Sequence, residues 1–175
     1  MKLIALNGAK TVGTTTIAKA LQFRSRDVKI LSFATPLRAM LNAIGVEDRY
    51  LNLDKEEPVP GLGKSARDML CTLGTEWGRG MVNESIWLWA MGRQIDELVY
   101  NSKRPDDLII VIDDCRFPKE ADWVKCSGGK VVCLFRDGIE YTKGHDSELP
   151  LPENLIDYKL DAGDIQNSVN IILPI

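Results

Sequence analysis

A glycine-framed loop near the N-terminus constrains the fold of this chain more than any other feature. Residues Lys2 to Leu6 form a short apolar run that predicts a buried strand, and Gly8 to Gly13 follow it as a loop. From Thr14 to Gln22 the apolar side chains recur at helical spacing, and hydroxyl residues open this helix. A strand, a loop of this length and such a helix form the layout of a phosphate-binding loop, in which backbone N–H groups cradle phosphates. A plain strand–turn–helix has the same spacing, so both interpretations stay open on spacing alone.

The loop departs from the usual phosphate-binding pattern at one position. Lysine ordinarily follows the second glycine, and here that place holds Thr14. Lys10, inside the loop, could reach over the phosphates instead. Thr15 or Thr16 can still offer a hydroxyl to magnesium, and Thr15 is the predicted ligand. The predicted donor-binding residues of this segment are Gly8, Ala9, Lys10, Val12, Gly13, Thr14, Thr15 and Thr16.

Alternating strands and helices predict the fold class. Further strands are expected at Val28–Phe33, Leu108–Ile112, Val131–Phe135 and Tyr158–Leu160. Helices are expected from about Pro36 to Ile44 and at Ser65–Leu73, Asn83–Val99 and Pro118–Lys125. This order implies an α/β fold in three layers, with a parallel sheet of about five strands flanked by helices. The tail beyond Ile165 is ambiguous between helix and strand.

One segment of the chain is too irregular for either element. Glu47–Lys64 is polar and rich in proline and glycine, and it is too short to link two domains. We therefore expect residues 1–175 to form a single domain in which Glu47–Lys64 is a mobile loop on the acceptor side of the active site.

The composition excludes several classes of function. A net charge of -3 and a pI near 5.3 argue against a protein that binds a nucleic acid polymer, because such proteins carry a basic excess. Four cysteines without a CxxC pair, together with one histidine, argue against a zinc site. No apolar run reaches the roughly 20 residues that span a bilayer. We expect a cytoplasmic protein without a membrane partner, and the sequence leaves a homodimer open.

Carboxylates and arginines supply the second set of candidates. Asp113 and Asp114 follow the apolar run Leu108–Ile112, as an acid does at the carboxyl end of a Walker B strand, although many core strands end in aspartate as a simple turn or cap. Guanidinium groups suit phosphate oxygens in two-point contacts, although each arginine alone is more often a solvated surface residue. The arginines that could converge are Arg38, Arg67, Arg79, Arg93, Arg116 and Arg136.

Read together, these segments resemble the phage deoxynucleoside monophosphate kinases. The matching stretches are LSFATPLR at 31–38, LCTLGTEWGR at 70–79 and DCRFPKE at 114–120. RDG at 136–138 and GHDSE at 144–148 look like two further segments of that family. The resemblance covers nearly the whole chain from Met1 to about Leu160, and LGTEWGR and DCRFP are its most distinctive parts.

The resemblance implies a P-loop kinase fold and transfer of the ATP γ-phosphoryl group to a deoxynucleoside 5′-monophosphate, with Mg²⁺. It implies catalytic roles for Asp114 and Arg116 and adds Arg136 to the ATP-binding residues. Lys10 is the catalytic candidate in place of the lysine that the family pattern has and this chain lacks. The residues it places around the acceptor are Arg38, Arg67, Glu76, Trp77, Arg79, Asp114, Arg116, His145 and Glu148.

Two alternatives remain beside an active kinase of bacteriophage type. Because the usual lysine is absent, the chain could be a homologue that binds nucleotide but has lost transfer and serves a regulatory or assembly role. It could also be a P-loop kinase for another small acceptor, such as a modified nucleotide or a coenzyme precursor. The sequence does not name the acceptor base.

Overall fold

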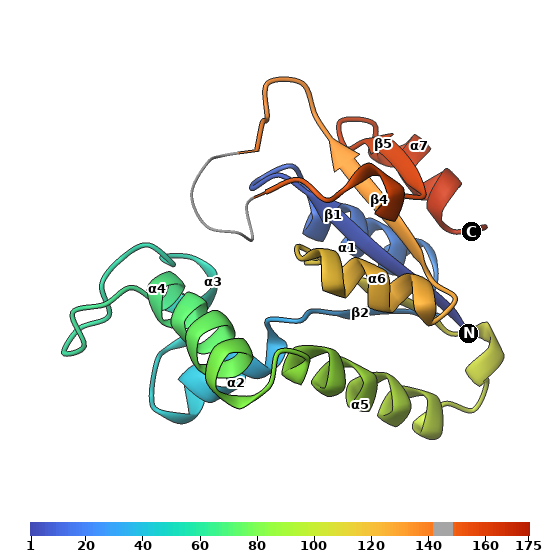
Figure 1. Ribbon diagram of the computed structural model, residues 1–175. Helices are drawn as coiled ribbons and strands as arrows, with labels where there is room; N and C mark the ends of the chain where they lie inside the picture. Colours follow the sequence, from blue (N-terminus) through green and yellow to red (C-terminus); the bar gives the residue numbers. More distant parts are fainter. Residues whose placement is uncertain (142–148) are drawn as a thin grey trace. The chain divides into compact units, whose positions relative to one another are not determined.

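The structure is a computed structural model that describes residues 1–141 and 149–175, and it contains a parallel β-sheet (Figure 1). Within these residues the strands are ordered β2-β3-β1-β4-β5, and all neighbours pair in parallel. Their bounds are β1 (Lys2–Gly8), β2 (Val28–Leu31), β3 (Ile109–Ile112), β4 (Lys130–Phe135) and β5 (Tyr158–Asp161). The predicted parallel sheet of about five strands is therefore confirmed, and the central strand is the one that leads into the glycine-framed loop.

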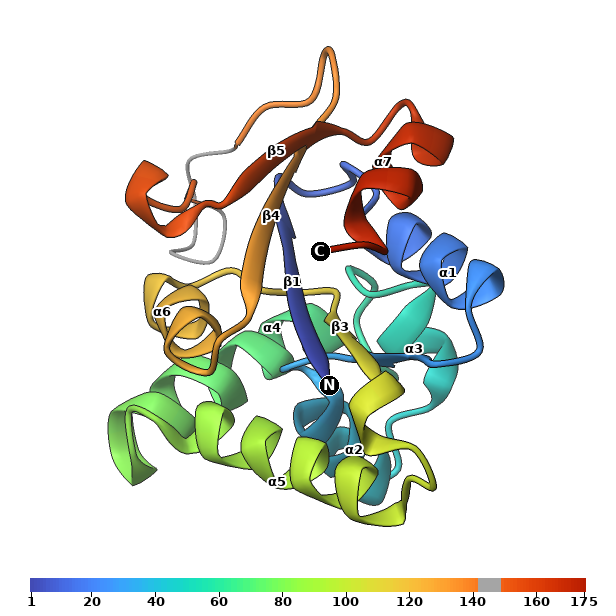
Figure 2. The ribbon, with the colours of Figure 1, turned by 90° about the vertical axis from the view of Figure 1, so that its right-hand side faces the viewer.

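Helices cover both faces of the sheet, as continuous apolar strands require. Figure 2 shows α1 (Thr14–Arg24) and α7 (Ile165–Ile172) on one side of β1 and β4, with α6 (Pro118–Cys126) on the other. The tail that was ambiguous in sequence is helix α7, because Val169 and Ile172 recur at helical spacing and are buried in the same apolar cluster as Ile17 and Leu21 of α1. Short 3₁₀ turns occur at Pro105–Asp107 and Glu153–Leu155.

The chain divides into two compact units. Residues Met1–Ser32 and Gln94–Ile175 form the first unit, which contains the whole sheet, and Phe33–Arg93 form the second. The second unit contains α2 (Thr35–Ala43), α3 (Asp48–Asn52), α4 (Ala66–Cys71), a π-helix (Thr72–Val82) and the start of α5 (Ile86–Asn101). That the two units act as one kinase domain, as the sequence predicts, stays a prediction.

The segment Glu47–Lys64 is more regular than the sequence predicts. Asp48–Asn52 form helix α3, and Pro58 pairs with Ser65 in an isolated β-bridge. The physical reason is that Leu51 and Val59 are buried in an apolar cluster of the second unit. The expectation of an irregular stretch was therefore wrong for these residues, and the expected mobility of the segment stays a prediction.

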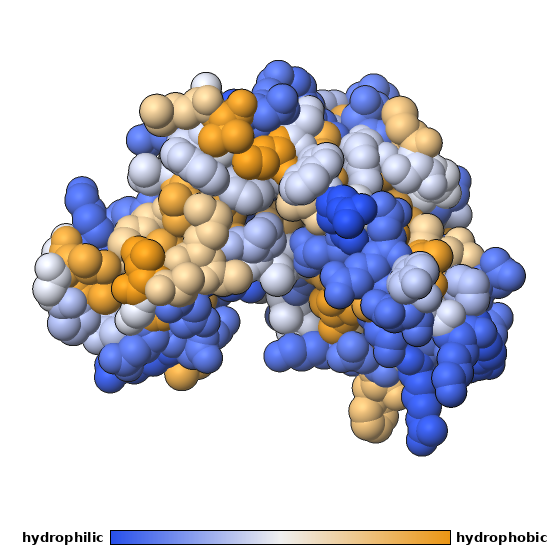
Figure 3. All heavy atoms as spheres, turned by 90° about the horizontal axis from the view of Figure 1, so that it is seen from below, coloured by the Kyte–Doolittle hydropathy of each residue, from blue (hydrophilic) through white to orange (hydrophobic). Residues whose placement is uncertain are grey.

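The surface mixes polar and apolar side chains. Figure 3 shows apolar areas interspersed with hydrophilic ones on the face that it presents. In the residues that the structure describes, no helix has both the length and the apolar character needed to cross a membrane.

Candidate active site

The motif from Gly8 to Thr16 runs from the last residue of β1, at the carboxyl edge of the sheet, through a loop into the first turn of α1. The loop turns back on itself through a hydrogen bond from Val12 N to Ala9 O of 3.1 Å. Thr11 and Gly13 take positive φ angles of 67° and 116°, which reverse the chain before the helix begins. Within the loop, Ala9 and Val12 are buried, whereas Lys10 is exposed to solvent. The two apolar side chains therefore anchor the loop and leave its outer backbone for a ligand.

Gly8 is required because two backbone segments approach each other closely at this point. A Cβ atom on Gly8 would lie 2.6 Å from Val12 Cγ1 and 2.8 Å from the carbonyl oxygen of Leu134 in β4. No ordinary side chain fits at such distances, so the first glycine of the motif serves the packing of the loop against β4.

The N-terminus of α1 provides an anion-binding end of a helix. Gly13 is the residue that caps it, and glycine offers no side-chain acceptor to the N–H groups of the first turn. The first turn also contains no acidic residue that would compensate the positive end of the helix dipole. Both facts favour phosphate oxygens as the partners of this helix end.

The two aspartates after β3 point to different partners. Asp113 N donates to Leu31 O of β2 at 3.1 Å, and Cys115 N donates to Leu6 O of β1 at 3.2 Å. The Asp113 carboxylate accepts a hydrogen bond of 2.9 Å from Thr15 Oγ1, whereas the Asp114 carboxylate accepts one of 2.5 Å from Ser32 Oγ. Of the two acids, Asp113 is therefore the one that meets the predicted magnesium ligand Thr15.

The sequence offered both aspartates as candidates at the end of the strand, but only Asp114 was named as a site residue. Alternation along the strand offers a partial signal, because Asp113 has the parity of Ile109 and Val111, which pack in the cluster that contains Ile17 of α1. The hydroxyl of Thr15 and the carboxylate of Asp113 are both hard oxygen donors, which fit Mg²⁺. The residues present therefore suit a magnesium ion bound together with phosphate oxygens.

A buried glutamate orients the backbone at Arg116. The Glu120 carboxylate is 3% exposed and accepts the N–H groups of Arg116 at 2.8 Å and Phe117 at 3.1 Å. This contact is half of a capping arrangement at the start of α6, where Pro118 occupies the first turn. The backbone after Asp114 is thus fixed by hydrogen bonds at the N-terminus of α6, which holds the half-buried Arg116 in place.

Arg136 lies beside the phosphate loop. Its Nη2 donates to Ala162 O at 3.0 Å and is 4.0 Å from the position that a Cβ would take on Gly13. Its Nε is buried and has no hydrogen-bond partner in the described part of the chain. A buried donor without a partner is unfavourable, so this guanidinium is suited to a further acceptor.

Five of the acceptor residues predicted from the motifs belong to the second unit, namely Arg38, Arg67, Glu76, Trp77 and Arg79. Arg38 Nε is buried and, within the described ranges, lacks a hydrogen-bond partner, whereas Arg67 Nε lies 3.6 Å from a carboxylate oxygen of Glu56. Glu76 is exposed, and Trp77 is 37% exposed. The site shared with Asp114 and Arg116 stays a prediction, and His145 and Glu148 lie outside the described residues.

A π-helix carries the LGTEWGR motif. Arg79 Nη1 and Trp87 Nε1 both donate to the carbonyl oxygen of Gly74, at 3.0 Å and 2.8 Å. A Cβ on Gly78 would lie 2.4 Å from the Trp87 ring, so the second glycine of the motif lets this ring approach. The widened turn leaves Gly74 O available to two side chains, and π-helical turns often occur at functional sites.

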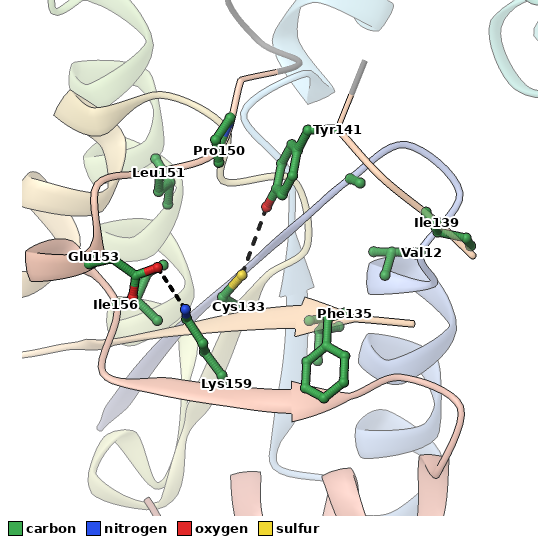
Figure 4. A pocket seen from close by; sticks show the side chains of 12 residues that line it. Val12, Cys133, Phe135, Ile139, Tyr141, Pro150, Leu151, Glu153, Ile156 and Lys159 are labelled. Carbon is green, nitrogen blue, oxygen red and sulfur yellow. Dashed lines mark hydrogen bonds and ion pairs between the residues drawn. The ribbon is translucent and has the colours of Figure 1, made fainter. Parts of the chain in front are cut away.

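A cavity of about 260 Å³ lies against the phosphate loop in the first unit (Figure 4). Ala9 and Val12 line it from the loop, and Cys133 and Tyr141 lie side by side in it, with 3.8 Å between Sγ and Oη. An ion pair between Lys159 and Glu153 forms another part of the wall. Burial raises the pKa values of the Cys133 thiol and the Tyr141 hydroxyl, so both groups are protonated at neutral pH.

The chain is similar in sequence to two viral proteins. It is 35% identical over 85 residues to deoxynucleoside-5′-monophosphate kinase of Escherichia phage T5, a match that covers 45% of this chain and 31% of the phage protein. It is 28% identical over 163 residues to a protein of Acanthamoeba polyphaga mimivirus named deoxynucleotide monophosphate kinase, with 86% of this chain and 82% of that protein covered. The resemblance that the motifs indicate is therefore confirmed. No family model matches the chain.

A solved structure supports the fold. Dephospho-CoA kinase from Campylobacter jejuni superposes with a TM-score of 0.54 and 12% identity, covering 99% of this chain and 96% of that one. At this identity the likeness shows the fold alone, which is a kinase-type α/β fold.

Proposed function

We propose that this chain, which is similar to deoxynucleoside monophosphate kinases over most of its length, is a phosphotransferase that uses ATP to phosphorylate a deoxynucleoside 5′-monophosphate. The observation that carries the proposal is the hydrogen bond of 2.9 Å between Thr15 Oγ1 and the Asp113 carboxylate. It joins the start of the helix after the phosphate loop to the acid at the end of β3, as magnesium-dependent transfer from a nucleotide requires.

Different residues of the first unit are proposed to bind the phosphates of ATP and the magnesium ion. Phosphoryl transfer depends mainly on positioning and on neutralising negative charge. The outer backbone of the loop and the N-terminus of α1 bind the donor phosphates, and Thr15 with Asp113 holds Mg²⁺, which would neutralise charge on them. Arg136 adds a cation beside Gly13.

The acceptor is assigned to the arginines that the motifs point to. A nucleoside monophosphate brings about two negative charges, and a partly dry site accepts them only beside cations. The arginines proposed to supply such charges are Arg38, Arg67, Arg79 and Arg116. The buried Nε of Arg38 supports this assignment, because it has a donor to give to a phosphate oxygen. Glu76, Trp77, His145 and Glu148 complete the proposed acceptor set.

The deciding experiment is an ADP-release assay with ATP, Mg²⁺ and each deoxynucleoside monophosphate in turn. We expect turnover with at least one of the four common acceptors. Nucleotide binding is measured separately by calorimetry, because binding without turnover would instead identify a homologue that has lost transfer. Thr14, which replaces the usual lysine, is the observation that supports this second function.

We place the protein in the cytoplasm, where ATP is available. Sedimentation distinguishes a monomer from a homodimer.

Whether the Lys10 ammonium group assists catalysis can be tested by moving this positive charge from position 10 to position 14. If Lys10 substitutes for the missing lysine, Lys10→Ala should lower kcat by about 100-fold, because a charge-assisted contact is worth roughly 1.5–3 kcal/mol and counts for more in the transition state. Thr14→Lys should then restore part of the loss in the double variant Lys10→Ala/Thr14→Lys. Turnover is measured against ATP concentration, with Lys19→Ala on the exposed side of α1 as the control. Unchanged kinetics in all variants would contradict this account of the loop.

The acceptor arginines should affect the acceptor more than the donor. We expect Arg79→Ala and Arg116→Ala each to raise the acceptor KM or lower kcat by at least about tenfold, the effect of losing a contact to a charged group. The ATP KM should change less, and Arg67→Ala should act more weakly. Arg26→Ala, at an exposed position before β2, is the matched control. Acceptor kinetics that are unchanged in both Arg79→Ala and Arg116→Ala would show that the motifs do not bind the substrate here.

A further inference from the structure

Asn7 is a polar residue at the end of an otherwise apolar strand. The preceding residues of β1, Leu3 to Leu6, are buried and apolar, and Asn7 itself is only 2% exposed. A buried amide costs free energy unless both of its polar groups are hydrogen-bonded. A hydrophobic residue at this position would stabilise the core more. The side-chain hydrogen bonds of Asn7 therefore indicate why the sequence has an amide there.

Both polar groups of the Asn7 side chain have partners from other segments. Nδ2 donates to Cys115 O at 2.9 Å, and Oδ1 accepts a hydrogen bond of 3.0 Å from Tyr141 Oη. The carbonyl of Cys115 can only accept, so Nδ2 must face it and Oδ1 must face Tyr141. The tyrosine hydroxyl is thereby the donor, and because burial raises its pKa it keeps this proton across the working pH range.

The backbone of Cys115 is held at both of its polar groups by β1. Its N–H donates to Leu6 O at 3.2 Å, and its carbonyl oxygen accepts from the Asn7 amide. Cys115 directly follows Asp113 and Asp114, whose carboxylates accept hydrogen bonds from Thr15 of α1 and from Ser32 after β2. The acid pair is thus fixed at one end by β3 and at the other by Asn7.

We infer that Asn7 and Tyr141 are positioning residues for the transfer reaction, which hold the Asp113–Asp114 pair in register with the phosphate loop. The inference rests on the proposed function. Tyr141 follows β4 and lines the cavity with Ala9 and Val12 of the phosphate loop. Its hydroxyl contacts Asn7 of β1, whose amide in turn donates to Cys115 after the acid pair. Neither side chain is expected to touch substrate. They act by fixing the position of the Asp113 carboxylate, which in turn determines how well Mg²⁺ would bind.

The test is Tyr141→Phe, which removes the hydroxyl and little else. We expect kcat to fall by about tenfold, the low end of the effect seen when a residue that orients a metal ligand is lost. The Mg²⁺ concentration for half-maximal activity should rise several-fold, while the ATP KM at saturating Mg²⁺ changes little. Tyr100→Phe is the matched control, because Tyr100 is 89% exposed on α5. Cys133→Ala, which removes the other neighbour of the hydroxyl, should leave the Mg²⁺ dependence as in the wild type.

A role in folding alone has a different signature. It would lower the melting temperature of Tyr141→Phe and leave the Mg²⁺ dependence of the folded enzyme unchanged, and this result would overturn the inference. The variant Asn7→Ala tests the same contact chain at its second residue, because it removes the amide that donates to Cys115 O. If both residues act through Cys115, the double variant Asn7→Ala/Tyr141→Phe should lose no more activity than Asn7→Ala alone, because residues of one network are not additive. Additive losses would also overturn the inference.

Failure of the proposed function can be told apart from failure of this inference. An active wild type with an unchanged Tyr141→Phe variant overturns only the inference. If the wild type binds ATP without turnover, the transfer function fails, and calorimetry with ATP decides the inference: Tyr141→Phe should weaken binding several-fold with Mg²⁺ present and leave metal-free binding unchanged. A wild type that neither turns over nor binds ATP overturns both.

Discussion

Replacing Asp113 by asparagine should lower kcat by at least about 100-fold while the protein stays folded. The amide keeps the size of the side chain and can still accept the hydrogen bond from Thr15 Oγ1, but it offers no negative charge to a metal ion. Loss of residues that merely orient a metal ligand costs 10–100-fold in activity, so loss of a ligand itself should cost at least the upper value. The measurement is ADP release at increasing Mg²⁺ concentration, together with thermal unfolding of the same preparation.

Two further variants separate the candidates for this role. Asp114→Asn alters the acid for which the motif resemblance implies a catalytic role and which accepts a hydrogen bond from Ser32. We expect its Mg²⁺ dependence to resemble that of the wild type, whatever its effect on acceptor kinetics. Asp122→Asn, on the exposed side of α6, is the control for removal of a carboxylate. A shifted Mg²⁺ requirement in Asp114→Asn but not in Asp113→Asn would reverse the assignment of the metal-binding acid.

Gly8→Ala should lower the free energy of unfolding by about 3 kcal/mol, the upper end of the cost of overpacking a dense site. The added methyl group would meet Val12 Cγ1 at 2.6 Å and the backbone oxygen of Leu134 at 2.8 Å. The side chain of Val12 can rotate, but a carbonyl inside β4 can move only if the β1–β4 pairing changes. We therefore also expect weaker ATP binding, because the loop would no longer lie flat against β4.

Urea unfolding of Gly8→Ala measures the stability, and calorimetry with ATP measures the binding. Gly80→Ala is the control, since the nearest atom to its added Cβ is Thr75 O at 3.4 Å, an ordinary contact. It should change the free energy of unfolding by less than about 1 kcal/mol. A stable Gly8→Ala protein with the affinity of the wild type would show that the loop tolerates a side chain here and that its geometry is not set by this approach.

Local patterns predicted most elements of the first unit because each element carries its own signal. The apolar runs at Lys2–Leu6 and Leu108–Ile112 lie within or overlap strands β1 and β3, and the glycine-framed loop separates β1 from α1 as expected. Parallel strands buried on both faces read as continuous apolar runs, which are the easiest strands to recognise. The tail at 165–172 was harder, because a segment of eight residues that mixes apolar and polar side chains satisfies either period until its burial against α1 is known.

The second unit was predicted less well where its structure depends on contacts distant in sequence. Proline and glycine in Glu47–Lys64 indicated a loop, yet Leu51 and Val59 are drawn into the apolar cluster around Leu41. The π-helix over the LGTEWGR motif has no local sequence period of its own. It depends on Trp87, thirteen residues beyond Gly74, whose ring packs on Gly78 and whose Nε1 donates to Gly74 O.

The sequence by itself determined the fold class, the place of the phosphate loop and the resemblance to nucleotide kinases, because these rest on residues adjacent in the chain. Only the tertiary structure decided which acid meets Thr15 and why Asn7 is an amide. Asp113 and Asp114 are neighbours with the same chemistry, and the direction of each side chain follows from the pairing of β3 with β2 and of Cys115 with β1. Contacts between residues about 100 positions apart set that direction, and the alternation along β3 signals it only in part.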